Sequence, residues 1–332
     1  MRRYVLRRLG QAVGVLLAAY TVSFIVLDLL PGDPVSAMAV GGLDGNPVDP
    51  AQLAALRHEY GFDKPVLVQF LDYLGRALRG DFGNSVATGR PVTTTIAEAL
   101  PQTLELAGAA LLIAVVVGAG IAMYGTYSRS RLVRQLLLSL PPLGVSLPTF
   151  WIGLMLVQLF SFRVHLFPAF GNDGVPGLVL PAVTLAVPTA AQLAQVLAKS
   201  LATTLAEPYI DTAKAKGAGP LRIQLRHALR NASLPALTLA GLLVGNLVAG
   251  SVVVESVFAR NGIGRVTIQA VTVQDIPMVQ AVVVFGSLVF VLVNLAVDLV
   301  YPLLDPRIAL ARPGRAPQPV PAAEAMRVGS PQ

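Results

Sequence analysis

The sequence contains no cysteine and few charged residues, and both shortages narrow the range of possible functions. Without cysteine there is no disulfide, no thiolate nucleophile and no cysteine-based metal site. Asp, Glu, Lys and Arg make up only 13% of the 332 residues, whereas hydrophobic residues make up 54%. With a mean hydropathy of +0.66, this composition is too apolar for a soluble chain of this length. We therefore expect a membrane protein.

Six windows are long and apolar enough to cross a hydrocarbon core, which takes about 20 helical residues. Only the first window contains a charged residue, Asp28. The pattern predicts an all-α membrane protein with six transmembrane helices. The windows are Leu9–Leu30, Leu106–Tyr124, Leu136–Phe160, Val175–Ala198, Ala236–Val254 and Pro277–Val297.

The positions of Lys and Arg predict the orientation of these helices. If the N-terminus is cytoplasmic, most of the 25 basic residues fall on the inner side, within residues 2–8, 129–134, 199–230 and 307–327. Positive charge in short loops favours the cytoplasmic side of the membrane. We therefore expect both termini in the cytoplasm, and we attribute the net charge of +7 to this placement and not to a nucleic-acid partner.

The windows and the segments between them divide the chain into regions. We expect an N-terminal transmembrane helix (1–30), an extracytoplasmic loop domain (31–100), a five-helix core (101–305) containing a cytoplasmic loop (199–235), and a disordered tail (306–332). Helical spacing in the loop domain covers Gln52–Tyr60 and Val66–Leu78. The basic start also fits a signal peptide, but its apolar run is about twice the usual length and a rigid turn, Pro31–Pro34, follows it.

The cytoplasmic loop contains an unusually basic stretch, Tyr209–Pro235, between two long apolar runs. Pro208 at a helix start and Gly217 at a helix end predict one short helix, and Gly219-Pro220 predicts the start of a second. In the second helix, leucines and arginines each recur every four residues, as two stripes: Leu221, Leu225 and Leu229, and Arg222, Arg226 and Arg230. The stretch is either a surface for anionic lipid or a docking element for a cytoplasmic protein.

This stretch resembles the cytoplasmic loop of ABC-importer permeases, whose pattern is Glu-Ala-Ala, three residues, Gly, and later Leu-Pro. Asp211-Thr212-Ala213 stands at the first three positions, Gly217 at the glycine, and Leu234-Pro235 at the end. Asp211 and Thr212 depart from the Glu-Ala of the general pattern. This departure resembles the variant found in the dipeptide, oligopeptide and nickel permeases. In these permeases Arg-His-Ala-Leu-Arg-Asn follows, and Arg226–Asn231 matches it in full.

The resemblance continues along nearly the whole chain, with motifs in the family's order. One departure is Ala281 after Gln280, where the family usually has glycine. The chain is thus similar to the first of the two permease subunits of such importers. The matching motifs are Leu30–Pro34, Tyr60–Pro65, Gly80–Ser85, Ala249–Glu255 and Leu303–Arg307.

The resemblance implies a type I importer permease that passes peptides across the cytoplasmic membrane. Its partners would be a second homologous permease, two cytoplasmic ATPases, an extracytoplasmic substrate-binding protein and membrane lipid. ATP and Mg²⁺ would be bound by the ATPases, since this chain has no GxxxxGK[ST] phosphate loop. Ala213 and Ala215 would let the ATPase approach closely. The docking residues implied are Asp211, Thr212, Ala213, Lys214, Ala215, Lys216, Gly217, Arg222, Arg226 and Arg230.

Three alternatives stay open at this point. A nickel-chelate or glutathione-type permease shares the motifs, whereas an ion-coupled secondary carrier would need charged groups near the bilayer midplane. A scaffold protein could use the basic loop only to recruit a partner.

Other polar residues allow simpler predictions. We expect Glu105 and Glu255 to lie at the membrane interface, and Asp298 to pair with a loop arginine or a helix cap. The three histidines, His58, His165 and His227, fall on different segments and predict no metal site. Candidates for lining a substrate path are Ser146, Gln158, Gln192 and Asn246.

Overall fold

The computed structural model describes residues 2–29, 51, 54, 57–58 and 63–304, and most of these residues are helical. In chain order, the first elements are α1 (Arg2–Leu29), α4 (Val66–Ala77), α5 (Val92–Tyr127), α6 (Arg131–Ser146), α7 (Thr149–Leu156), the π-helical η1 (Val157–Arg163), α8 (Gly174–Leu205) and α9 (Pro208–Ala215). They are followed by α10 (Pro220–Arg222), the π-helical η2 (Ile223–Ala228), α11 (Leu229–Val257), α12 (Ile263–Thr272) and α13 (Ile276–Leu304).

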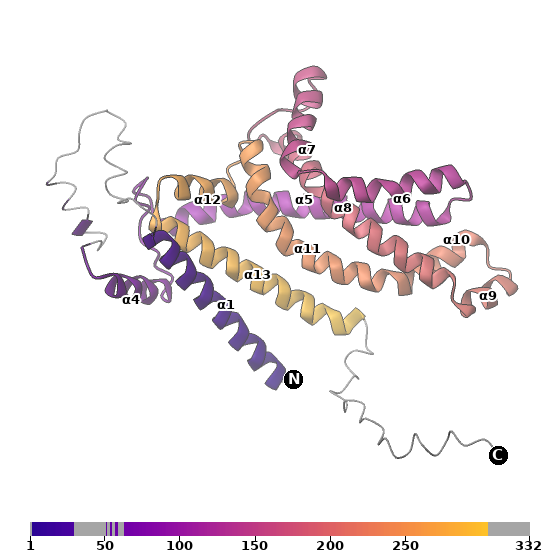
Figure 1. Ribbon diagram of the computed structural model, residues 1–332, viewed down its shortest axis with the longest axis horizontal. Helices are drawn as coiled ribbons and strands as arrows, with labels where there is room; N and C mark the ends of the chain where they lie inside the picture. The colour runs from indigo at the N-terminus through magenta and orange to yellow at the C-terminus, as the bar shows by residue number, and fades with distance from the viewer. Residues whose placement is uncertain (1, 30–50, 52–53, 55–56, 59–62, 305–332) are drawn as a thin grey trace, which may run out of the picture.

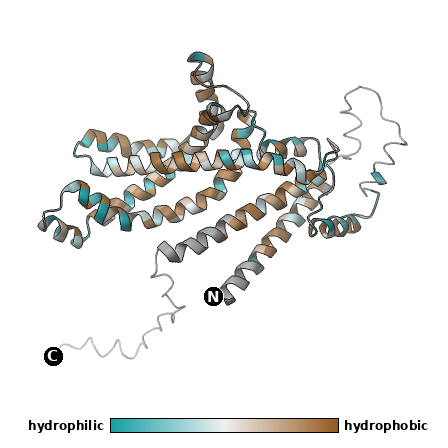
Figure 2. Ribbon diagram, turned by 180° about the vertical axis from the view of Figure 1, so that it is seen from behind, coloured by the Kyte–Doolittle hydropathy of each residue, from teal (hydrophilic) through white to brown (hydrophobic). Residues whose placement is uncertain are grey.

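Helices α5, α8 and α11 run between two ends of the molecule (Figure 1). We call them the α9 end, with α9 and α10, and the α12 end, with α4 and α12. On α5, Thr103 contacts α12 and Thr126 contacts η2, and their separation of 23 positions corresponds to about 35 Å of helix. The distance between the ends therefore matches a hydrocarbon core of about 30 Å. Hydrophobic residues cover much of α5, α8 and α11 between these ends (Figure 2).

Four stretches of helix in the described part of the chain are long and apolar enough to span a membrane, namely Gly10–Leu27, Val92–Tyr127, Gly174–Leu205 and Pro220–Val257. They contain the first, second, fourth and fifth predicted windows almost completely. The sixth window lies in α13, whose described apolar part, Ile276–Leu292, is shorter than a full span. The helical membrane fold is confirmed, whereas the number of six spans stays a prediction.

The third window, Leu136–Phe160, is not one uninterrupted helix, and whether it forms a single bent span stays a prediction. It contains the C-terminal part of α6 and the start of a second segment, and the two are bent by 106°. The break has a local cause at Pro148, because proline disfavours helical conformation in the preceding residue and has no N–H to donate. Leu147 is accordingly extended, with ψ of 131°.

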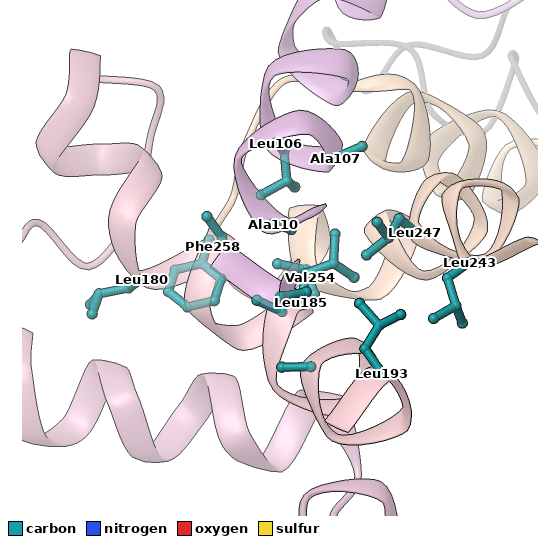
Figure 3. Packing of buried hydrophobic residues seen from close by; sticks show 14 of the residues in the cluster. Leu106, Ala107, Ala110, Leu180, Leu185, Leu193, Leu243, Leu247, Val254 and Phe258 are labelled. Atoms are coloured by element: carbon teal, nitrogen blue, oxygen red, sulfur yellow. The ribbon is translucent and has the colours of Figure 1, made fainter. Parts of the chain in front are cut away.

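Small residues bring α5 and α8 close together. Ala110, Ala114, Gly118 and Ala122 recur every four residues on α5 and are all buried. A Cβ atom on Gly118 would lie 2.7 Å from the carbonyl oxygen of Ala190 on α8, so only glycine fits there. We call this contact the α5–α8 seam. It is continuous with the central buried cluster, which includes Leu106 of α5, Leu185 of α8, Leu247 of α11 and Phe258 (Figure 3).

The described part of the predicted loop domain packs on the α12 end. The predicted helix Val66–Leu78 is α4, which ends one residue earlier. Phe70 of α4 packs on Tyr20 and Phe24 of α1, with ring centroids 5.7 and 5.3 Å apart. The predicted helix Gln52–Tyr60 falls largely, and the predicted tail 306–332 wholly, outside the described residues.

Candidate functional site

The short helix α9 begins and ends at the residues that the sequence indicates. Glu207 is extended and Pro208 is the first helical residue, a position where the missing N–H of proline matters least. At the other end Gly217 has φ of +81°. The N–H of Gly217 bonds to the Lys214 carbonyl and the N–H of Ala218 to the Ala213 carbonyl, which is the Schellman arrangement. The predicted helix and turn are confirmed.

One side of α9 is anchored and the other is exposed. Ile210 is 1% exposed and packs with residues from the ends of α5 and α8 and the start of α11. Ala213 also packs against this cluster and is half-buried, so it faces its own protein, and only Ala215 of the two alanines is fully exposed. The remaining predicted docking residues of α9 and its turn are exposed: Asp211, Thr212, Lys214, Lys216 and Gly217. Lys214 and Asp211 form an ion pair at 2.8 Å.

The second helix differs from the regular pattern assumed from its sequence. Its π-helical segment η2 turns Ile223, Gln224 and Ala228 inward, whereas Leu221 and Leu225 are 56% and 45% exposed. Of the leucine stripe, only Leu229 packs on the protein. The extra residue in a π turn breaks the four-residue repeat, which explains the change. Arg222, Arg226 and Arg230 are exposed.

Hydrogen bonds fix η2 and α9 to the long helices. The Gln224 amide donates to the Met123 carbonyl at 2.7 Å and to the Thr126 hydroxyl at 2.9 Å, both near the end of α5. The Tyr209 hydroxyl donates to the His227 carbonyl, and the Asn231 amide donates to the Tyr209 hydroxyl, each at 3.2 Å. Packed and hydrogen-bonded contacts therefore connect α9 and η2 with α5, α8 and α11.

The four candidates for a substrate path are spread over four segments. Ser146 ends α6 and donates to the carbonyl of Pro142 in its own helix at 2.8 Å. Gln158 and Asn246 are exposed, and Gln192 is half-buried. No hydrogen bond joins any two of the four within the described part of the chain, so their role stays a prediction.

The sequence interpretation missed the polar residues at the α12 end. Glu255, predicted to be interfacial, is completely buried within the protein near the end of α11, and it accepts hydrogen bonds from Thr103 and from the start of α12. Arg260 and Asp275 are 1% and 2% exposed. Glu105 is exposed, in keeping with an interfacial position. The predicted pairing of Asp298 concerns a side chain outside the described ones.

Asp275 connects the segment around Ser85 to the core. Its carboxylate accepts the Ser85 hydroxyl and the N–H groups of Val86 and Ala87, and also the N–H of Met278 in the first turn of α13. The residue therefore caps α13 and fixes the segment around Ser85 at the same time. A signal for it exists in the sequence, since Asp followed by Ile-Pro is typical of a helix start.

The described residues contain no group of three or more His, Asp or Glu side chains that could hold a metal ion. Burial lowers the pKa of Arg260, and the nearby carboxylates of Glu105 and Glu255 oppose this shift.

Comparison with known protein families matches almost the whole chain. Residues 110–310 match the model described as "Binding-protein-dependent transport system inner membrane component". Residues 1–107 match the model of the N-terminal region of such membrane components.

Two relatives are similar over nearly their full length. One is a probable peptide ABC transporter permease protein, y4tP, of Sinorhizobium fredii, 36% identical over 92% of this chain and 98% of that protein. Another is the glutathione transport system permease protein GsiC of Salmonella typhimurium, 37% identical over 93% of this chain and 99% of that protein.

The fold is also found among solved structures. A chain of the MetNI methionine ABC transporter, solved in inward facing conformations, aligns with 64% of this chain and 97% of its own length. The TM-score is 0.52 and the sequence identity 18%, so this likeness concerns the fold alone. By the two family models and the two relatives, the chain belongs to the family of binding-protein-dependent transport system inner membrane components and is an inner-membrane permease of an ABC importer.

Proposed function

We propose that this permease passes short peptides inward and is driven by ATPases that dock on α9. The observation that carries the docking role is the two-sided character of α9, which is anchored through Ile210 and exposes charged and small residues on the other side. ATP and Mg²⁺ are held by the two ATPase subunits. A second homologous permease and a substrate-binding protein complete the importer.

The proposed topology has six spans, with α9 and both termini in the cytoplasm and the α12 end outside. In this arrangement α13 is the sixth span, and α6 with α7 and η1 forms a bent third span. Residues 31–100 then form the extracytoplasmic domain, and membrane lipid surrounds the spans.

The topology can be tested by labelling, and the absence of cysteine makes the test direct. A single cysteine in place of Asn84 or of Lys216, both exposed, is the only thiol in the chain. A membrane-impermeant thiol reagent added to intact cells should label the Asn84 variant and not the Lys216 variant. Reversed labelling would contradict the orientation and the cytoplasmic docking site.

The docking role can be tested by adding bulk to the exposed side of α9. Replacing Ala215 with Trp should block the approach of the ATPase and lower its co-purification with the permease. Ala87, an exposed alanine at the α12 end, offers the matched control, Ala87→Trp, which should co-purify normally. Equal recovery of the ATPase with both variants would contradict docking on α9.

The substrate proposal rests on the polar character of the spans and on the relatives. The candidate path residues are Ser, Gln and Asn, and not the His or carboxylates that suit a metal ion. One relative carries a name with peptide and another a name with glutathione, which is itself a tripeptide. The alternative substrates are glutathione, which the name of the second relative suggests, and a nickel chelate, whose permeases share the sequence motifs.

Uptake separates these substrates. Cells with and without the gene are compared for labelled di- to pentapeptides, glutathione and nickel. We expect loss of peptide uptake in cells without the gene. Loss of nickel uptake with peptide uptake intact would overturn the proposal.

A further inference from the structure

The start of α12 is held by a carboxylate from another helix. Glu255, near the end of α11, accepts the N–H of Gly264 at 2.8 Å and the N–H of Arg265 at 3.3 Å through Oε2. Its other oxygen accepts the hydroxyl of Thr103 on α5 at 2.7 Å. The Thr103 hydroxyl in turn accepts the N–H of Ile263 at 2.8 Å. The first three N–H groups of α12 are thus satisfied by side chains of α11 and α5.

Two glycines make this contact possible. A Cβ atom on Gly262 would overlap with the Glu255 carboxylate, and one on Gly264 would overlap with the backbone of Val252. Both glycines are buried, and neither has a positive φ. They are therefore explained by the close approach of α12 to α11 and not by a turn.

Arg260 extends the same contact to α8. This side chain is 1% exposed and donates to the Gly177 carbonyl of α8 and to the Gln102 amide oxygen of α5, each at 3.1 Å. The Asn261 N–H donates to Asn172, just before α8, at 3.1 Å. The ends of α5, α8 and α11 are therefore joined to α12 by polar contacts, most of them buried.

The helix that carries Glu255 also leads to the docking element. α11 runs without interruption from Leu229, directly after η2, to Val257, which is about 43 Å of helix. At the start of α11, the Asn231 amide donates to the Tyr209 hydroxyl of α9, and Ala232 lies in the same buried cluster as Ile210 of α9. One continuous helix thus connects the proposed ATPase site with α12.

We propose that Glu255 is a positioning residue for transport, which makes α12 follow the movement of α11 when the ATPases act on α9. A rigid helix transmits displacement along its length, and a bonded element at its end moves with it. α12 packs through Ile263 and Ala270 in a cluster with Val92 of α5 and Met278 of α13, so its displacement changes the packing of the α12 end. This inference rests on the proposed docking of the ATPases on α9.

The test compares Glu255→Ala and Glu255→Gln with the control Glu98→Ala in the assembled importer in liposomes. Glu98 is an exposed carboxylate of α5 that pairs with Arg90. Alanine leaves buried N–H groups without an acceptor, whereas glutamine keeps the shape and one acceptor oxygen. Peptide uptake per assembled complex and peptide-stimulated ATP hydrolysis are measured together with the recovery of the ATPase.

We expect uptake per complex to fall about tenfold or more in Glu255→Ala, a typical size for coupling between distant sites. The loss should be smaller in Glu255→Gln, and Glu98→Ala should stay within about twofold, as most exposed substitutions do. ATP hydrolysis should continue in the Glu255 variants but lose its dependence on peptide. A merely structural role would reduce the amount of complex and leave the ratio of transport to hydrolysis unchanged.

Unchanged uptake per complex in both Glu255 variants overturns the proposal. If Glu255→Ala does not assemble, Glu255→Gln decides, and normal coupling in that variant overturns it as well. Failure of the ATPase to bind the unsubstituted chain would instead contradict the proposed function.

Discussion

The two ends of the molecule use charged residues in opposite ways. At the α12 end, Glu255, Arg260 and Asp275 are at most 2% exposed and bind within the chain. At the α9 end, the side chains of Arg222, Arg226 and Arg230 are exposed and form no ion pair within the described part of the chain. A buried charge needs bonded partners to be tolerated, so it fixes neighbouring helices. An exposed charge needs no such partner, and in the proposed function these three arginines belong to the ATPase-docking surface.

The two ends also differ in why they need glycine: Gly264 at the α12 end has no room for a side chain, whereas Gly217 at the α9 end has a positive φ. The largest expected effect on stability comes from Gly264. Gly264→Ala would place a methyl group against the backbone of Val252, which cannot turn aside as a flexible side chain can. Overpacking of this kind destabilises by about 1–3 kcal/mol or more. Thermal unfolding of the purified chain should show a clear decrease in the midpoint. A midpoint equal to that of the unsubstituted chain would mean that α12 does not pack on α11 in this way.

Removal of one buried hydroxyl at the α12 end should have the next largest effect. Thr103→Val keeps the shape but leaves the Ile263 N–H without an acceptor and one Glu255 oxygen without a donor. The expected loss of stability is about 1–3 kcal/mol. Chemical denaturation compares this variant with Thr94→Val, an exposed threonine of the same helix. Equal stabilities of the two variants would contradict the buried network.

At the α9 end a glycine is required by its backbone and not by lack of space. A Cβ atom on Gly217 would have nothing within 4 Å, but φ is +81°. Gly217→Val should therefore strain the turn by about 1 kcal/mol or more, leaving the chain folded and inserted but weakening ATPase association and transport. Gly219, also with free space but with φ of −71°, gives the control Gly219→Val. Transport equal in both variants would rule out the role of the Gly217 turn.

The smallest effect concerns an exposed ion pair near the α12 end. Asp81 accepts from Arg76 at 3.0 Å and from the Gly83 N–H at 2.9 Å, and these bonds lower the pKa of Asp81. A carboxylate with a lowered folded-state pKa stabilises the fold above its unfolded-state pKa of about 3.9, and this contribution is lost as the pH falls through the folded-state pKa. Asp81→Asn should be slightly less stable than the unsubstituted chain at neutral pH and equally stable in acid. A difference that grows toward low pH would contradict this sign.

The sequence alone predicted the features that depend on residues close to one another along the chain. The apolar windows predicted most of the long helices, and Pro208 and Gly217 predicted the bounds of α9, because length and capping are local properties. It did not indicate which proline interrupts a helix, since Pro148 stands at the break whereas Pro181 and Pro188 remain inside the continuous helix α8.

The burial of Glu255 could not be predicted, because it depends on Thr103, which lies 152 residues away in the chain. Its position at the end of an apolar run favoured an interfacial place. A signal existed in Gly262 and Gly264, because glycines just before and inside the start of a short helix indicate a close backbone approach. The exposure of Leu221 and Leu225 also depends on residues far away in the chain. The π turn of η2 accompanies the inward position of Gln224, whose amide bonds to Met123 and Thr126 of α5.

The α5–α8 seam has a consequence for the entropy of conformational change. Alanine and glycine have no side-chain rotamers to lose when they are buried, whereas a seam of leucine or methionine must order its side chains each time it forms. Along Ala110, Ala114, Gly118 and Ala122, contact with α8 therefore orders almost no side-chain torsions. When the two helices shift against each other in this stretch, α5 has no side-chain rotamer to order again, and only side chains of α8 such as Leu193 do.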